Sequence, residues 1–466
     1  MRVNWFSPLP PASTGIAHYA ARLLPALSAR AEVVVWTDQP KWDQRALAGV
    51  SVRRYRPGQL PWNELNRTDL TVYHIGNNHI FHGAIWQVSQ QHPGLVVLHD
   101  WSLHQLFYHI YAEQGRSLHP YLEQIGKYYG DEARRDVTGR LSHLEQHIYH
   151  LSERYPLTTL ALENSLGAVA HTPEAFARLR RENRWPVTYA PLPFPAAPRR
   201  ASSEGNGRFT ADGPPYGLII FGYLGRNRQL NAVLRALAEF PRRAEFRLDI
   251  CGELVDREYW KELLGALGLK PLVRLRGFVP EAELDAALAS AHLAINLRHP
   301  TMGEASLSQL RLWSHALPSL VSHAGWYASL PAEAVAFVRP GTEVEDVHAH
   351  LDAFLADPAR FKRMGERGRQ LLELEHSPEA YADSLLAAAR LAQDFRPQWA
   401  ARFLAGRAGA ALGALGGAKG PSALAAESAG RQIYELFGSQ SGEREQGTTA
   451  NAPWSDGSLQ KSVSRY

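Results

Sequence analysis

Two series of short apolar runs, separated by helical or polar stretches, constrain the fold of this chain more than any other feature. They are residues 2–7, 33–36, 70–74, 95–98 and 168–171, and then 218–221, 246–250, 273–276, 293–297, 320–321 and 336–338. Such alternation is typical of βαβ units with a parallel sheet. A stretch rich in Arg, Ser and Gly divides the two series. We therefore expect an α/β fold with two Rossmann-like domains, an N-terminal one over 1–195 and a C-terminal one over 216–392, joined by a linker over 196–215.

Residues 393–466 form an Ala/Gly-rich, low-complexity tail that we expect to be partly disordered. One amphipathic patch, Ile433–Phe437, is expected to dock on the body of the protein, with a lipid surface as the alternative. Ser, Gly, Thr and Asn dominate after about residue 440, so we expect this end to be dispensable.

Bulk composition restricts the class of protein. A length of 466 residues exceeds one ordinary core, and 45% hydrophobic and 21% charged residues are typical of a soluble globular protein. The single cysteine, Cys251, excludes an internal disulfide framework. No apolar signal region and no run of about 20 apolar residues is visible, so we expect a cytoplasmic protein. The net charge of +4 is compatible with peripheral contact at the inner face of the membrane, and no aromatic-basic pattern indicates nucleic-acid binding.

The turn His299–Ser306 carries one carboxylate, Glu304, between the apolar run 293–297 and a helical pattern that starts near Leu307. Such a turn places an acidic side chain and a helix N-terminus at the carboxyl edge of a parallel sheet, where ligands bind. Free backbone N–H groups at a helix N-terminus attract phosphate. We therefore expect Glu304 to head a helix within a binding site.

Two further signals point to the same edge. In the turn from Gly222 to Arg228, glycine lets the backbone approach a phosphate, and an arginine adds a charged contact; an ordinary strand-to-helix turn is the alternative. His99 follows the apolar run 95–98, where an imidazole hydrogen-bonds a sugar hydroxyl or stabilises charge. The alternative for His99 is a cap on the next helix.

Histidine clusters raise the question of a metal site. The first cluster is His143, His147 and His150, and the second is His74, His79 and His82. No carboxylate stands at the spacing that a zinc-binding helix requires. We expect packed or solvated histidines, no metal and no cofactor.

Taken together, these motifs resemble the GT-B glycosyltransferases, and among them the retaining family 4 (glycosyl transferases group 1), over about residues 2–392. The matching pieces are Gly15, His99, Gly222 with Arg228, the segment from Gly277 through Phe278 to Pro280, and the turn from Gly303 to Ser306 with Pro318. Segments 73–78 and 93–100 further resemble a bacterial subgroup associated with surface polysaccharide assembly.

The resemblance implies transfer of a sugar from a nucleotide-diphosphate donor to a glycan or lipid-linked glycan acceptor, with retention of configuration. It implies His99 and Glu304 as catalytic residues. The substrate-binding residues that it implies are Gly15, Gly222, Arg228, Gly277, Phe278, Gly303, Ala305, Ser306 and Leu307.

Two positions depart from the family pattern. Tyr223 stands where the family has a basic residue, and Leu312 or Arg311 stands where it has a second glutamate that holds the nucleotide ribose. An arginine cannot accept hydrogen bonds from ribose hydroxyls. A non-catalytic glycan- or nucleotide-sugar-binding protein and a sugar-nucleotide epimerase therefore stay open as alternatives. A nicotinamide dehydrogenase is disfavoured because no Gly-x-Gly-x-x-Gly opens either domain.

Overall fold

The structure, a computed structural model, describes residues 1–47, 49–141, 144–198, 213–254, 256–416, 424, 428 and 431–432. Residues Met1–Gln393 form one compact unit, and a second unit begins at Asp394. The predictions for the central part of the linker, for the patch Ile433–Phe437 and for the chain beyond residue 440 lie outside the described residues. The predicted domain boundaries stay predictions.

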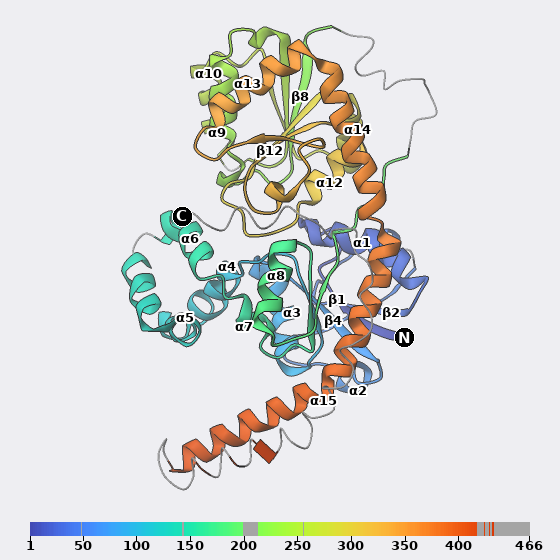
Figure 1. Cartoon of the computed structure of the whole chain (residues 1–466), viewed down its shortest axis with the longest axis vertical. Helices are drawn as coiled ribbons and strands as arrows, with labels where there is room; N and C mark the ends of the chain where they lie inside the picture. Colours follow the sequence, from blue (N-terminus) through green and yellow to red (C-terminus); the bar gives the residue numbers. More distant parts are fainter. Residues whose placement is uncertain are drawn as a thin grey trace, which may run out of the picture. The chain divides into compact units, whose positions relative to one another are not determined.

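The N-terminal half forms a parallel sheet in the order β3-β2-β1-β4-β5-β6-β7, of which Figure 1 labels β1, β2 and β4. Its strands are β1 (Arg2–Phe6), β2 (Glu32–Thr37), β3 (Ser51–Arg54), β4 (Leu70–Ile75), β5 (Leu95–Leu98), β6 (Gly167–Ala170) and β7 (Val187–Tyr189).

The C-terminal half forms a second, separate parallel sheet in the order β10-β9-β8-β11-β12-β13. Its strands are β8 (Tyr216–Phe221), β9 (Phe246–Cys251), β10 (Val273–Gly277), β11 (Leu293–Asn296), β12 (Ser319–Ser322) and β13 (Ala336–Val338). Two separate parallel sheets agree with the predicted pair of Rossmann-like domains.

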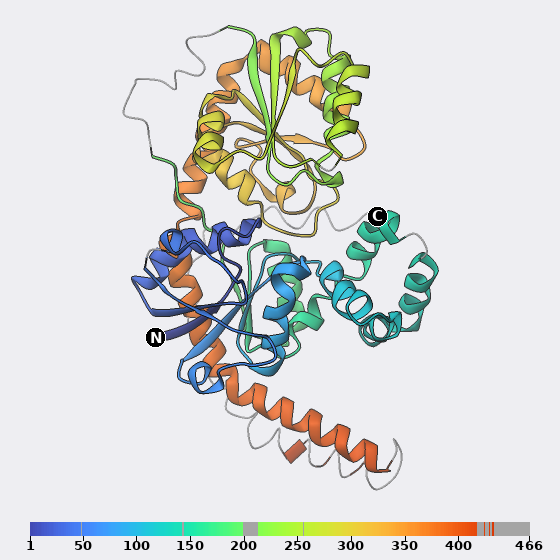
Figure 2. The same cartoon turned by 180° about the vertical axis from the view of Figure 1, so that it is seen from behind.

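Helices accompany both sheets, as the two opposite views show (Figures 1 and 2). In the N-terminal half they are α1 (Gly15–Ser28), α2 (Trp62–Leu65), α3 (His79–Gln91), α4 (His104–Tyr108), the π-helical turn His109–Glu113, α5 (Leu118–Arg140), α6 (Leu144–Arg154), α7 (Thr158–Leu162) and α8 (Pro173–Glu182). In the C-terminal half they are α9 (Leu230–Glu239), α10 (Arg257–Ala266), α11 (Glu281–Ser290), α12 (Leu307–Ser314), α13 (Glu343–Ala356) and α14 (Pro358–Glu375). The last helix, α15 (Pro378–Gly416), returns to the N-terminal half, where the hydroxyls of Tyr381 and Tyr19 lie 2.9 Å apart and Asp383 pairs with Arg30. None of the helices in the described part of the chain is long and apolar enough to cross a membrane.

The core explains why the strands are continuous apolar runs. In β8, Leu218 and Ile220 pack into one cluster with α9 and α13, whereas Ile219 and Phe221 pack into another with α11 and α12. Successive side chains of a strand face opposite sides. Because both faces of this sheet are covered, the strand cannot alternate between apolar and polar residues.

Two strands escaped the sequence analysis, β3 and β7. Both lie at the edges of the N-terminal sheet. In β3 three of the four residues are exposed, and in β7 none is fully buried. Edge strands with so little burial carry no apolar signal that would separate them from loops.

Helix α12 begins at Leu307, where the sequence analysis placed the start of the helical pattern, but Glu304 does not head it. Its N-cap is Ser306, whose hydroxyl accepts a hydrogen bond from the backbone N–H of Gln309 at 3.1 Å, and its first turn holds no acidic residue. Serine is a favoured N-cap because it satisfies one of the free N–H groups of the first turn. Glu304 therefore belongs to the preceding loop and does not cap the helix.

Candidate functional site

The loop that follows β5 and the loop that follows β11 contact each other directly. The backbone N–H of Ser102 donates to the carbonyl of Met302 at 2.9 Å. Gly303 has a φ of +75°, and a Cβ placed on it would lie 2.4 Å from the Cβ of Trp101. Only glycine tolerates both the left-handed backbone and this approach. Gly303 therefore allows the loop after β5, in the N-terminal sheet, to contact the loop after β11, in the C-terminal sheet.

A small hollow lies at this junction. Its walls consist of Leu98, His99, Asp100, Trp101, His171, Thr172, Ala175 and Gly303. The structure thus brings two predicted site residues, His99 and Gly303, to one place.

Glu304 lies beside the hollow, but its surroundings differ from the expected helix end. Its carboxylate forms an ion pair with Arg298 and accepts a hydrogen bond from the backbone N–H of Met302 at 2.7 Å. The Glu304 side chain is only 9% exposed, so the pair is shielded from water. Burial opposes the charged form of Arg298, yet the carboxylate of Glu304 outweighs it and the pKa of Arg298 is raised. The sequence analysis overlooked Arg298, although it is a basic residue directly after an apolar run.

Asp100 is a second carboxylate at the junction. Its Oδ2 accepts a hydrogen bond from the backbone N–H of Asn77 at 2.7 Å. Burial and, next, the negative charge of Glu304 raise the pKa of Asp100 to about 7, although Asn77 and Arg298 act in the opposite direction. Asp100 was part of the motif around His99, but no single-residue signal distinguished it from a helix-capping aspartate.

Arg228, the expected phosphate contact, is almost fully buried. Its Nη1 donates to the side-chain oxygen of Asn296 and its Nη2 to the carbonyl of Phe221, both at 2.9 Å. Burial, followed by the charge of Arg298, lowers the pKa of Arg228 to about 10. The Nε–H groups of Arg228 and Arg298 are buried and have no hydrogen-bond partner among the described residues. Unpaired buried donors are rare, so each of these two neighbouring cations keeps one N–H group available for a hydrogen bond.

The other predicted substrate-binding residues near α12 lie close together. A Cβ on Gly222, whose φ is +106°, would lie 3.5 Å from the hydroxyl of Ser308, in the first turn of α12. A Cβ on Gly15, which opens α1, would lie 3.1 Å from the Leu307 side chain. Gly222 of one half and Gly15 of the other therefore both lie against the first turn of α12. Ala305 and Ser306 come directly before this turn.

Gly277 and Phe278 lie further along the sheet. Gly277 is the last residue of β10 and Phe278 follows it, and the strand order places β9 and β8 between β10 and β11. The carbonyl of Gly277 accepts from the N–H of Gly252 at 2.8 Å, and Phe278 is 76% exposed. The contacts of the described residues do not bring this pair to Glu304. Tyr223, in the Gly222 turn, is likewise 79% exposed.

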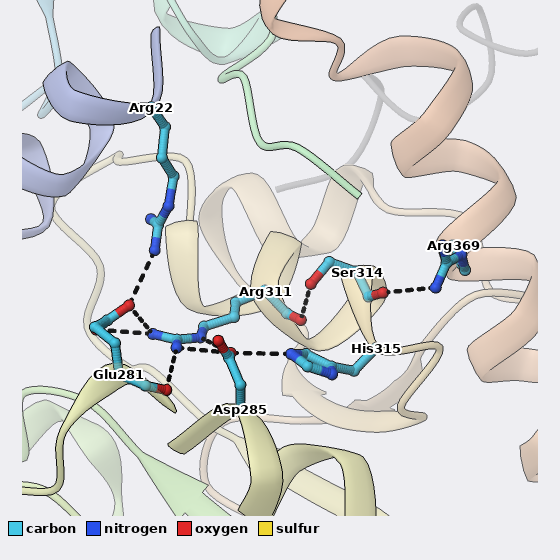
Figure 3. A network of polar contacts seen from close by, with 7 residues as sticks. All are labelled: Arg22, Glu281, Asp285, Arg311, Ser314, His315 and Arg369. Carbon is cyan, nitrogen blue, oxygen red and sulfur yellow. Dashed lines mark hydrogen bonds and ion pairs between the residues drawn. The ribbon is translucent and has the colours of Figure 1, made fainter. Parts of the chain in front are cut away.

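Arg311 is one of the two residues, with Leu312, that stand where the family resemblance implies a ribose-binding glutamate, and Figure 3 shows where its side chain points. Its Nη2 and Nε donate to Asp285 at 2.7 and 3.0 Å, and its Nη1 donates to Glu281 at 3.1 Å. Burial alone would raise the pKa of Asp285, but Arg311 lowers it. Arg22 of α1 reaches Glu281 from the other half of the protein at 3.3 Å. The guanidinium of Arg311 is therefore held by α11.

Members of the second histidine cluster contact other groups of the protein. His79 stacks on His109 with ring centroids 4.0 Å apart, and His82 Nδ1 donates to the carbonyl of His74 at 2.9 Å. His143 lies outside the described residues. Within the part of the chain that the structure describes, no three His, Cys, Asp or Glu side chains are grouped so that they could hold a metal ion.

Residues 228–387 match a family model described as glycosyl transferase-like. A search of curated proteins found no match. Among solved structures, a sucrose-phosphate synthase from Thermosynechococcus elongatus is 19% identical with a TM-score of 0.55, covering 84% of this chain and 98% of its own.

Two further structures show the same likeness. The Anabaena protein HepE, solved in complex with UDP-glucose, is 11% identical with a TM-score of 0.55, covering 83% of this chain and 98% of its own. WaaG, a glycosyltransferase involved in lipopolysaccharide biosynthesis, is 15% identical with a TM-score of 0.51, covering 82% and 98%. The fold of this protein is therefore the GT-B fold, as the sequence predicted.

Proposed function

We propose that this protein is a retaining glycosyltransferase that moves a sugar from a nucleotide-diphosphate donor to a glycan or lipid-linked glycan. The observation that carries the proposal is the junction of Gly303 with Trp101. It places the shielded Glu304–Arg298 pair of one half beside His99 of the other, at the carboxyl edges of two parallel sheets. The GT-B fold and the glycosyl transferase-like match over residues 228–387 support it.

The donor diphosphate would lie between the Gly222 turn and the start of α12. The unpaired Nε–H groups of Arg228 and Arg298 and the first N–H groups of α12 offer positive charge there. The structure of HepE with UDP-glucose supports a nucleotide sugar as the donor class. Gly277 and Phe278 would lie nearer the base, and Ala305, Ser306 and Leu307 nearer the diphosphate.

Glu304 and His99 would act on the donor sugar. Glu304 would accept hydrogen bonds from sugar hydroxyls, and His99 would hydrogen-bond the sugar from the opposite half. As the bond to the diphosphate breaks, the two arginines and the α12 dipole stabilise the charge of the leaving group. Retention would follow from attack on the face from which the diphosphate leaves, without a covalent intermediate. Catalysis would then rest on positioning and electrostatics.

The acceptor would bind on the N-terminal half, over residues 1–195, with Gly15 at its edge. The C-terminal half, residues 216–392, would hold the donor, and residues 196–215 would link the two. We place the reaction in the cytoplasm, with peripheral contact at the inner face of the membrane for a lipid-linked acceptor.

A non-catalytic nucleotide-sugar-binding protein is the second candidate. The ion pairs of Arg311 with Asp285 and Glu281 favour it, because they occupy the position from which the family resemblance implies a ribose contact. Such a protein would bind donor without releasing nucleoside diphosphate.

One experiment separates the two candidates. Purified protein is first screened by thermal shift against nucleotides and nucleotide sugars, and the stabilising donor is then incubated with glycan acceptors. We expect release of nucleoside diphosphate and a product whose anomeric configuration, read by NMR, equals that of the donor. A donor that stabilises the protein but is never cleaved would favour the binding protein. An inverted product would exclude retention, and a free epimerised nucleotide sugar would indicate an epimerase.

A further inference from the structure

His99 makes one side-chain hydrogen bond within the described residues, and its partner is another histidine. His74 Nδ1, in β4, lies 3.0 Å from His99 Nε2. His74 is completely buried, and its ring packs against Trp5 with centroids 4.1 Å apart. Burial is the first cause that lowers the pKa of both His74 and His99 well below the usual value, and nearby histidines lower it further. Both rings are therefore neutral near pH 7.

A neutral imidazole has one donor nitrogen and one acceptor nitrogen, so one ring donates and the other accepts. The neighbouring histidines show which ring nitrogen carries the proton in this region. His82, His104 and His171 each place Nδ1 against a backbone carbonyl, at 2.9, 2.7 and 3.0 Å. Because a carbonyl only accepts, all three carry their proton on Nδ1. His171 Nε2 is then a bare acceptor, buried without a hydrogen-bond partner among the described residues.

Only one direction of the His74–His99 bond avoids an unpaired buried donor. His74 Nε2 is also buried without a partner among the described residues. If His99 donated, His74 would carry its proton on Nε2, and that N–H would be unpaired. If His74 donates from Nδ1, its Nε2 is a bare acceptor like that of His171. Orphaned buried N–H groups are rarer than under-satisfied acceptors, so the second arrangement is favoured.

We propose that His74 is a positioning residue: its Nδ1–H donates to His99 Nε2 and holds His99 in the Nδ1–H tautomer. The other ring nitrogen of His99, Nδ1, is then a neutral donor. A neutral donor suits a sugar hydroxyl or ring oxygen. The tautomer follows from the geometry alone, whereas its use in transfer rests on the proposed function.

The tautomer is measured without any substrate. Protein labelled with nitrogen-15 at histidine is studied by NMR spectra that correlate ring nitrogens with ring protons, and the His99 signals are those absent from His99→Gln. We expect the Nδ1 of His99 to be protonated and its Nε2 bare. A His99 ring protonated on Nε2 would overturn the proposal.

Two substitutions at the same position test the role of His74. Asparagine can supply a side-chain N–H near the place of Nδ1, whereas leucine fills the space without a donor. We expect that in His74→Leu the His99 ring is no longer held in the Nδ1–H tautomer, so that the Nε2–H tautomer is also populated. The kcat/KM should fall by about threefold to tenfold, the scale of one neutral hydrogen bond. His74→Asn should restore both the tautomer and most of the rate.

A control keeps the result independent of lost stability. His376 is buried, donates from Nδ1 to the carbonyl of Leu192 and has no contact with His74 or His99 among the described interactions. His376→Leu should leave the His99 tautomer unchanged, whatever it does to the melting temperature. If His74→Leu leaves His99 protonated on Nδ1, His74 does not hold the tautomer. If the tautomer changes and kcat/KM does not, the role in transfer is refuted, while activity of the unaltered protein still supports the proposed function.

Discussion

Gly303 and Trp101 approach each other so closely that a Cβ on Gly303 would fall 2.4 Å from the Trp101 Cβ. With the hydrogen bond from Ser102 to Met302, this contact joins the loop that carries His99 to the loop that carries Glu304. The geometry of the candidate site therefore depends on one residue without a side chain.

We expect Gly303→Ala to reduce transfer strongly, because the new methyl group would push the two loops apart. The strain at φ +75° adds a stability cost of about 1–3 kcal/mol. Gly341→Ala is a matched control: Gly341 has a φ of +87°, and its Cβ would meet no atom within 4 Å. Denaturant unfolding and initial rates should show a stability loss in both variants and a large rate loss only in Gly303→Ala. Equal rate losses in the two would contradict the assigned junction.

Arg311 is expected to stabilise the fold rather than to recognise the nucleotide. Arg311→Met keeps much of the side-chain length and removes the bonds to Asp285 and Glu281, so we expect a stability loss of about 1–3 kcal/mol. The KM for the nucleotide sugar should stay unchanged within error. Arg22→Met removes the bond from α1 to the half-exposed Glu281 and the contact of the guanidinium with the Phe194 ring at 4.5 Å, and should cost about 1 kcal/mol. A large rise in KM for Arg311→Met, with normal stability, would assign Arg311 to the nucleotide site.

Asp100 should make stability depend on pH. Its pKa of about 7 in the folded protein is above the ordinary value of 3.8, so the folded state binds the proton more tightly than the unfolded chain. The resulting stabilisation is complete below about pH 4 and is lost as the pH rises through 7. We expect the free energy of unfolding, relative to Asp100→Asn, to fall between pH 4 and 7 and to level off above 8.

The control for this pH dependence is Asp131→Asn, which changes a carboxylate on α5 whose side chain is 72% exposed. It should leave the pH dependence of the unfolding free energy as it is in the unaltered protein. If the difference in unfolding free energy between the unaltered protein and Asp100→Asn stays constant from pH 4 to pH 8, the pKa of Asp100 is not raised in the folded protein.

Transfer should continue in excess chelator. The positive charge at the proposed diphosphate position comes from Arg228, Arg298 and the start of α12, so the leaving group can be stabilised without a divalent ion. Rates with and without chelator should agree. Complete inhibition that one divalent ion reverses would contradict this.

The sequence predicted the architecture because a strand covered on both faces must be an uninterrupted apolar run, as in β8. It did not predict β3 and β7, which lie at sheet edges and bury little. Within the site, a glycine or a carboxylate after a strand is visible in the sequence. The partners are not visible in it. Asp285 for Arg311 and Trp101 for Gly303 depend on how elements far apart in the chain pack, and Arg298 for Glu304 depends on the conformation of the loop after β11.

The structure also changes what is expected of Glu304→Gln. Glutamine in place of a carboxylate at a helix end would cost less than about 1 kcal/mol. In the shielded pair with Arg298 it leaves a buried cation less well compensated, so we expect about 1–3 kcal/mol. Unfolding measurements must therefore accompany the kinetic comparison.

The most direct test of the proposed reaction is the rate of nucleoside diphosphate release from the donor, in the presence of acceptor, for the unaltered protein and for Glu304→Gln. We predict that the folded variant turns over at least about a hundredfold more slowly, the scale for loss of one preorganised charge-stabilising contact. A Glu304→Gln protein that is folded and retains a near-full transfer rate would contradict the assignment of this site.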